Sequence, residues 1–97
     1  MKRVVKYNAV FVYNSEGIAV IFPACKGCVT CGKSDSQAKL MAADALRIWC
    51  SVVLDDGILL PPELSLLELN NWIKENKKNW GKSKWTVKLI KVCLEGY

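Results

Sequence analysis

The chain has 97 residues, of which 52% are hydrophobic and 24% are charged. This composition predicts one small domain over residues 1–97 and excludes an intrinsically disordered protein. Fourteen Lys and Arg residues against nine Asp and Glu residues give a net charge of +5, which permits an acidic or nucleic-acid partner without requiring one. Histidine is absent, which removes the commonest general base and a frequent zinc ligand.

The N-terminal part of the sequence predicts a β-hairpin. Residues 4–13 alternate in polarity at the period of a strand, and the polar face becomes apolar at Val10 and Val12. Residues 18–22 form a second strand that is apolar almost throughout, which indicates cover on both of its faces. Pro23 ends this strand because proline cannot donate to a strand ladder.

A short strand and a long helix follow the hairpin. Residues 28–31 are β-branched at their centre and lie between two glycines, which predicts a brief third strand. Ser34 and Gln37 have the spacing of a capping box, in which each side chain binds the other's backbone amide. The helix is expected over residues 35–54, and Gly57 ends it as a left-handed cap. The apolar positions expected to form its buried stripe are Ala38, Met41, Ala42, Ala45, Ile48, Trp49, Val52 and Val53.

The C-terminal part predicts an extended connector at residues 58–62, a short helix and a last strand. Ser65 and Glu68 give the short helix a second capping box. Its apolar stripe is expected to consist of Leu66, Leu69, Trp72 and Ile73. The resulting order, β-β-β-α-(short α)-β, predicts an α+β fold with a small antiparallel sheet and one main helix packed on one face.

The last strand, residues 84–94, changes its apolar face between Leu89 and Ile90. Either a β-bulge lies there or the strand pairs with another chain. A strand that is apolar on both faces seldom remains a bare edge, which predicts a homodimer or homotetramer. The predicted partner or oligomer interface consists of Trp85, Val87, Leu89, Ile90, Val92 and Leu94.

Three cysteines, Cys25, Cys28 and Cys31, have the two-residue spacing of thiolate ligands for zinc. A fourth ligand would have to be Cys50, which is out of phase with the apolar stripe of the helix, or Cys93 on the last strand. Neither belongs to a second closely spaced pair, so the metal-site pattern is incomplete. The simpler interpretation is that these cysteines are small buried side chains and that no cofactor is bound.

The sequence contains no catalytic constellation, and an enzyme is not predicted. Asp55 and Asp56 are adjacent carboxylates, but they lie at a helix end beside Gly57, where a structural role is simpler. A mixture of aromatic and basic residues fits either single-stranded nucleic acid or a core with solvated lysines, and the second interpretation is favoured. Its members are Trp72, Trp80, Trp85, Lys74, Lys77, Lys78, Lys82, Lys84 and Lys88.

The order of these motifs resembles the HicB-like antitoxin family, a small domain of type II toxin–antitoxin systems. In that family a hairpin leads to a phrase close to Phe-Pro-x-Leu-Pro-Gly-Cys-Val-Thr-x-Gly, then to a capped helix and a proline-rich link. Here residues 22–32 match the phrase, with Cys25 and Lys26 in place of the usual Leu-Pro, and the resemblance covers residues 5–62. The residues that match the family motif in a structural role are Phe22, Pro23, Gly27, Cys28, Gly32 and Gly57.

The resemblance implies a HicB-like, swapped-hairpin ferredoxin-like fold and a protein that neutralises a HicA-type RNA-cleaving toxin. It also implies that Cys28 is not a metal ligand. Many members of the family carry a C-terminal DNA-binding module, and none is visible here, so operator binding is not predicted. The alternatives left open are a cysteine-ligated zinc module, an RNA-binding module, and an orphan HicB-like domain without a toxin.

The N-terminal residues do not form a signal peptide, and no apolar run reaches the length of a membrane span. These features predict a cytoplasmic protein without a membrane partner. In that compartment the five cysteines are expected to be reduced.

Overall fold

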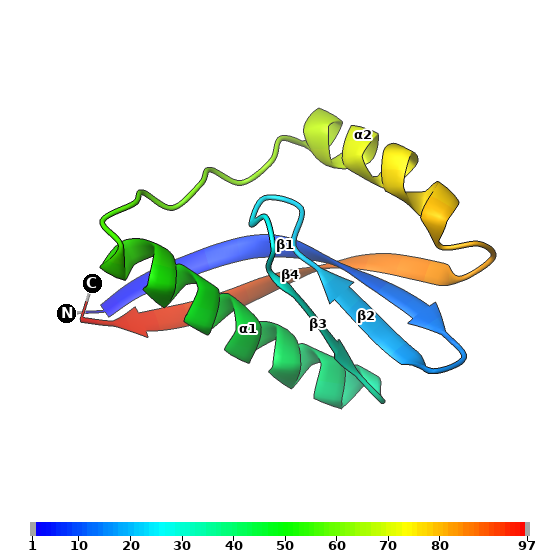
Figure 1. Cartoon of the computed structure of the whole chain (residues 1–97), viewed down its shortest axis with the longest axis horizontal. Helices are drawn as coiled ribbons and strands as arrows, with labels where there is room; N and C mark the ends of the chain where they lie inside the picture. The colour runs from blue at the N-terminus through cyan, green and yellow to red at the C-terminus, as the bar shows by residue number, and fades with distance from the viewer. Residues whose placement is uncertain (1, 97) are drawn as a thin grey trace.

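The computed structural model describes residues 2–96, and in that part the elements follow the predicted order (Figure 1). They are β1 (Lys2–Asn14), β2 (Gly17–Ile21), β3 (Val29–Gly32), α1 (Asp35–Asp55), α2 (Leu66–Asn76), the 3₁₀ turn η1 (Lys77–Asn79) and β4 (Lys84–Glu95). The strands form one antiparallel sheet in the order β3-β2-β1-β4. The α+β class is confirmed. Neither helix of this part is long and apolar enough to cross a membrane.

The two helices cover opposite faces of the sheet. Alternate side chains of β1 point to opposite faces, as in any strand. Phe11 therefore lies in the core beneath α1, whereas Val10 and Val12 lie in a smaller core with Leu69 and Ile73 of α2. β1 thus contributes to both cores, and its second face turns apolar only toward its C-terminal end because α2 covers only that part.

The same arrangement explains the pattern of β4. Its register with β1 is unbroken from Lys2↔Glu95 to Tyr13↔Lys84, so a β-bulge, one of the two alternatives that the sequence left open, is excluded. Val87 packs in the core of α2, whereas Ile90 packs in the core of α1. The apolar face of the strand changes because its cover passes from one helix to the other.

Helix α1 packs on the sheet through a stripe that differs from the predicted one. Its buried residues are Ala38, Ala42, Leu46 and Cys50, spaced four apart. Met41, Ile48 and Val52, which the periodicity placed in the core, are 40%, 65% and 54% exposed. The apolar arc of the helix is wider than its contact with the sheet. Its remaining side lies beside the edge strand β3, where no further strand of residues 2–96 covers it.

Two glycines allow the close approach of β3 to α1 and of the start of β2 to β3. A Cβ atom on Gly32 would lie 2.6 Å from the backbone nitrogen of Ala38, so β3 can approach the first turn of α1 only with glycine there. Gly17 has a φ of +148°, and a Cβ atom on it would lie 2.8 Å from the carbonyl oxygen of Gly32. Any larger residue at Gly32 would push the helix away from the sheet.

The helix caps follow the prediction in part. The Ser34 hydroxyl accepts a hydrogen bond from the Gln37 amide at 3.2 Å, but the Gln37 side chain accepts from the amide of Lys33 instead of Ser34. The first capping box is therefore only half formed. Ser65 and Glu68 form both bonds of the second box. Gly57 ends α1 with a φ of +74°, as expected.

Helix α2 contacts the sheet mainly through its later turns. Leu69 and Ile73 are buried and Trp72 is half-buried. Leu66, which was expected in the same stripe, is 75% exposed because the first turn stands away from the smaller core.

The connector between the helices, residues 56–65, covers an open strand edge. β2 pairs only with the C-terminal part of β1, so the earlier part of β1 has one unpaired side. There the backbone N–H of Asn8 donates to a carboxylate oxygen of Glu63 at 2.5 Å. The Tyr7 hydroxyl donates to the carbonyl oxygen of Pro61, also at 2.5 Å. These bonds hold the connector along β1, where it leads from α1 to α2 (Figure 1). The connector thereby delivers α2 to the face of the sheet opposite to α1.

Candidate interaction surfaces

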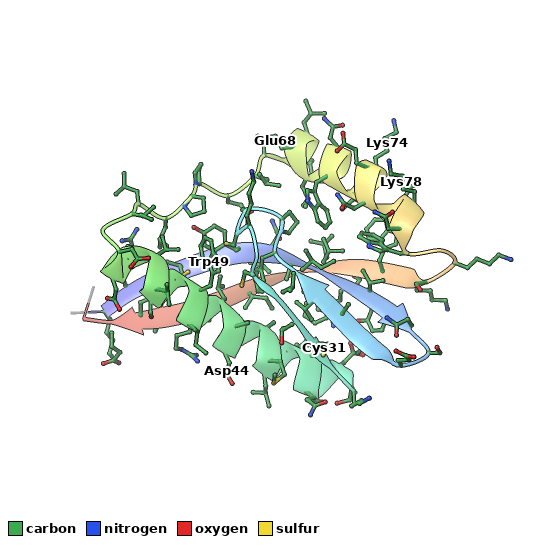
Figure 2. All side chains as sticks on the ribbon, in the orientation of Figure 1. Cys31, Asp44, Trp49, Glu68, Lys74 and Lys78 are labelled. Atoms are coloured by element: carbon green, nitrogen blue, oxygen red, sulfur yellow. The ribbon has the colours of Figure 1, made fainter. Side chains whose placement is uncertain are left out.

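The cysteine cluster is divided between core and surface. Cys25 and Cys28 are buried together with Cys50, whereas Cys31 is exposed on β3 (Figure 2). Burial raises the pKa of the Cys28 thiol to about 11, and it raises the pKa of Cys25 and Cys50 as well. In residues 2–96 no group of three or more Cys, Asp or Glu side chains is arranged to hold a metal ion. Cys50, predicted to lie outside the buried stripe, is fully buried in it.

The residues that match the family motif in the β2–β3 loop lie in the core or at turns of the chain. The loop between β2 and β3 is closed by hydrogen bonds from the Phe22 amide to the Cys28 carbonyl at 3.1 Å and from the Cys28 amide to the Cys25 carbonyl at 2.9 Å. Phe22 and Cys28 fill the core, Pro23 follows the end of β2, and Gly27 turns the chain with a φ of +85°. This loop therefore brings two small thiols into the core.

The predicted interface on β4 is split by the two cores. Ile90, Val92 and Leu94 are buried beneath α1 within the same chain, so their side chains are not at the surface. Val87 is half-buried under α2, and only Trp85 and Leu89 are exposed, at 41% and 57%. The apolar pattern on both faces of β4 thus has an explanation within one chain. The outer backbone edge of β4 carries no partner strand in the described sheet.

An apolar surface that is partly exposed lies where α1 meets β3. We call it the α1–β3 face, and it consists of Val29, Met41, Ala45, Ile48 and Val52. The four helical positions are spaced so that they form one line along α1. Val29 on the neighbouring edge strand is 61% exposed, and a hollow of about 370 Å³ lies between this strand and the helix. The periodicity identified these helical residues as apolar but assigned them to the core.

A hydrogen bond holds the β2–β3 loop against this face. The indole nitrogen of Trp49 donates to the carbonyl oxygen of Lys26 at 3.0 Å (Figure 2 labels Trp49). Trp49 therefore supports the floor of the hollow while its ring remains half-buried. This hydrogen bond joins α1 to the β2–β3 loop, so the two sides of the hollow are held together.

Charge is distributed unevenly over the molecule. From Asp35 to Asp56, four acidic residues stand against Lys39 and Arg47, so the segment of α1 is net acidic. The exposed Asp44 pairs with Arg47 at 3.0 Å (Figure 2). In contrast, residues 72–88 contain six lysines and a single acid, Glu75.

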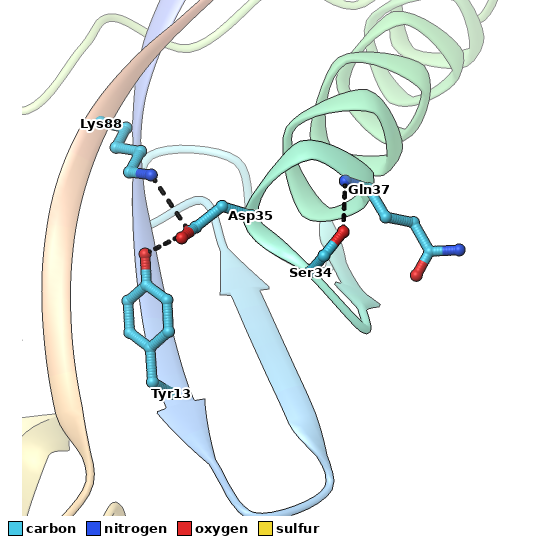
Figure 3. Close-up of polar contacts among 5 residues, drawn as sticks. All are labelled: Tyr13, Ser34, Asp35, Gln37 and Lys88. Carbon is cyan, nitrogen blue, oxygen red and sulfur yellow. Dashed lines mark hydrogen bonds and ion pairs between the residues drawn. The ribbon is translucent and has the colours of Figure 1, made fainter.

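A polar contact joins three elements at the start of α1 (Figure 3). Asp35 accepts a hydrogen bond from the Tyr13 hydroxyl at 2.7 Å and lies 3.3 Å from the Lys88 ammonium. These contacts lower the pKa of the Asp35 carboxyl, the Tyr13 hydrogen bond most strongly. The Lys88 ammonium also lies 4.9 Å from the centre of the Phe11 ring. Lys88 thus belongs to the α1 side of the sheet and not to the lysines near α2.

The aromatic and basic residues near the C-terminus occupy a second surface. Trp72, Trp80 and Trp85 contact one another in order, with ring centres 6.0 Å and 6.3 Å apart. The favoured interpretation placed Trp72 and Trp85 in the core. Trp72 is half-buried against the smaller core, and so is Trp80, whereas Trp85 is 41% exposed. Lys74 and Lys78 project from α2 (Figure 2), and with Trp80 and Trp85 they line a hollow of about 300 Å³.

Comparison with known proteins identifies the fold. No protein-family model matches the sequence, and no curated protein sequence matches it. Solved structures do match. A chain of a toxin–antitoxin complex from Streptococcus pneumoniae has a TM-score of 0.76 at 22% identity, covering 93% of this chain and 69% of that chain. A chain of the HicA3–HicB3 toxin–antitoxin complex has a TM-score of 0.66 at 19% identity, covering 91% and 98%.

The N-terminal domain of the Burkholderia pseudomallei antitoxin HicB has a TM-score of 0.59 at 14% identity, covering 87% of this chain and 95% of that domain. The molecule is thus an α+β module with a helix on each face of one antiparallel sheet. Its fold is HicB-like, as the motif order implied.

Proposed function

We propose that the chain is a non-enzymatic antitoxin-type module that binds and neutralises a HicA-like, RNA-cleaving toxin in the cytoplasm. The observation that carries this proposal is the HicB-like fold, which extends over 93% of the chain in its match to a toxin–antitoxin complex. A protein partner is also supported by the amount of apolar side chain that remains exposed on α1 and β3.

The α1–β3 face is the surface that we propose for the toxin. It joins Val29 of an edge strand to a line of apolar side chains on α1, so both backbone and side chains are accessible for contact. The segment of α1 is also net acidic, with Asp35 and Asp44 already paired within the chain. It would therefore not repel the basic surface with which an RNA-cleaving enzyme holds a polyanion.

Co-expression with a HicA-like toxin, taken from a neighbouring gene where one is encoded there, tests this function. The wild-type chain should relieve the growth arrest caused by the toxin and should co-purify with an inactive toxin variant. The double variant Ile48→Asp/Val52→Asp should lose both properties, because two charges would be buried in the interface. Leu40→Asp is the matched control, because Leu40 is 69% exposed on another side of α1.

The outcomes separate the function from the surface. A wild-type chain that neither relieves the arrest nor co-purifies contradicts the antitoxin function. A double variant that binds as well as the wild type contradicts only the assignment of the α1–β3 face.

We also propose that the chain forms a homodimer or homotetramer through the outer edge of β4. The support is a 12-residue edge strand whose outer backbone side has no partner strand in the described sheet and which displays Leu89, 57% exposed. Light scattering should give the mass of an oligomer at micromolar concentration, and Leu89→Lys should shift it toward the monomer. A monomer mass for the wild type across this range would contradict the assembly.

A further inference from the structure

The positive charge of this protein is concentrated in one part of the chain. Residues 72–84 carry five lysines and one glutamate, a net charge of +4 out of the +5 of the whole chain. Lys88 is not counted with them because it lies on the α1 side of the sheet with Asp35. The remaining nine basic residues stand against eight acidic residues, so the field around the molecule is directed mainly toward α2, η1 and the start of β4.

Lysines from one helix face line this region. Lys74, Lys77 and Lys78 are spaced three and four residues apart, so they lie on the same side of α2 and its continuation η1. All three are exposed, and within residues 2–96 none of them forms an ion pair. Like charges at this spacing repel one another, so an anionic ligand would relieve the repulsion.

An aromatic platform borders these lysines. Trp80 is fixed from beneath by Trp72 and by the smaller core, and its ring centre is 6.3 Å from that of Trp85. Trp85 stands on a strand and is 41% exposed. The hollow between the two tryptophans and the three lysines therefore combines exposed π-surface with cationic groups.

We propose that this hollow binds single-stranded nucleic acid, with a base stacked on Trp85 and phosphates held by Lys74, Lys77 and Lys78. Stacking on a fixed aromatic ring beside a lysine-lined track is the usual way in which proteins hold unpaired strands. A duplex presents no unstacked base to Trp85, so it would use the lysines alone. The site lies on the opposite side of the sheet from the α1–β3 face, and it does not depend on the toxin-binding proposal.

Fluorescence titration of the full chain with 12-residue oligo(U) and oligo(dT) tests the site at about 50 mM salt. Either strand should quench tryptophan emission with saturation, and the tighter of the two identifies the sugar. Trp85→Ala should weaken binding by about fivefold to a hundredfold, as expected for the loss of one base stack, whereas Trp85→Phe should retain most of it. Lys77→Gln/Lys78→Gln should weaken binding and reduce its dependence on salt.

Lys26→Gln/Lys39→Gln is the matched control, because it removes the same charge from the other side of the molecule and should change affinity little. The proposal is overturned if neither strand binds up to about 100 μM, or if the control pair weakens binding as much as the Lys77/Lys78 pair. It is also overturned if Trp85→Ala binds like the wild type, or if a duplex binds as tightly as the single strands. Equally tight binding of polyglutamate would show that the site takes acidic polypeptides instead.

Discussion

Cys25, Cys28 and Cys50 lie in the core beneath α1, whereas Cys31 and Cys93 lie at the surface. Burial removes water from the buried thiols and disfavours their charged form, which raises the pKa of each. A thiol must ionise to react or to bind a metal. The spacing of the cysteines in the sequence is therefore less informative than their division between core and surface.

Thiol labelling measures this division directly. With Ellman's reagent at pH 8, Cys31 and Cys93 should react within minutes, and the three buried thiols should react only as fast as the protein opens. In denaturant all five should react at once. Fast reaction of Cys25 or Cys28 in the native protein, located by mass spectrometry, would contradict their burial.

Alkaline pH should destabilise the protein. The pKa of Cys28 rises from 9.0 to about 11 and that of Tyr7 from 10.0 to about 12, in each case chiefly because of burial. Both groups hold their protons more tightly when folded. The contribution of Cys28 to stability is therefore complete below about pH 9 and is lost as the pH rises toward 11, and that of Tyr7 is complete below about pH 10 and is lost toward pH 12.

The urea midpoint should accordingly fall between pH 8 and pH 10.5 under reducing conditions. Cys28→Ala should show a smaller fall, because it lacks one of the groups that must ionise. A midpoint that stays constant over this range would contradict the proposed role of burial.

At the scale of elements, the close contact between β3 and α1 sets the position of the helix. Gly32→Ala would place a methyl group against the Ala38 backbone, at a point where neither element can move without disturbing the sheet. We expect a loss of about 1–3 kcal/mol in the free energy of unfolding. The adjacent Cys31→Ala, on the exposed side of the strand, should change it by less than about 0.5 kcal/mol. Equal effects of the two substitutions, measured by urea unfolding, would contradict the contact.

Two substitutions at positions two residues apart, on different sides of α1, test which stripe of the helix is buried. Leu46→Ala should cost about 2–5 kcal/mol, because this side chain is fully buried. Ile48→Ala should cost less than about 0.5 kcal/mol, because Ile48 is 65% exposed. The reverse order of unfolding free energies would restore the stripe that the periodicity predicted.

The elements themselves could be predicted from the sequence because their signals are local. Alternation marked β1, and serine caps marked both helix starts. The face of α1 that is buried could not be predicted, because the helix is apolar over more than half of its circumference and only the position of β3 decides which side is covered. The change of face in β4 was visible, but its cause was not. The two helices cover β4 from opposite sides, and this arrangement depends on tertiary packing that the sequence of the strand alone does not reveal.

At the scale of the whole molecule, the sheet separates two surfaces of different character. The α1–β3 face is apolar with a net acidic helix, whereas the α2–β4 side is basic and aromatic. The sequence indicated both residue sets but could not assign them to opposite faces. The proposed protein partner and the proposed nucleic-acid strand would therefore not compete for one site.

The most direct measurement of the central claim is the amide NMR spectrum of the isotope-labelled chain during titration with an inactive HicA-like toxin. We expect saturable shifts at Val29 and along Ala45, Ile48 and Val52 of α1, while the signals of α2 and its lysines remain in place. No saturable shift would contradict the antitoxin function. Shifts confined to α2 and the start of β4 would show that the toxin binds the basic side, and the account of the α1–β3 face would then be wrong.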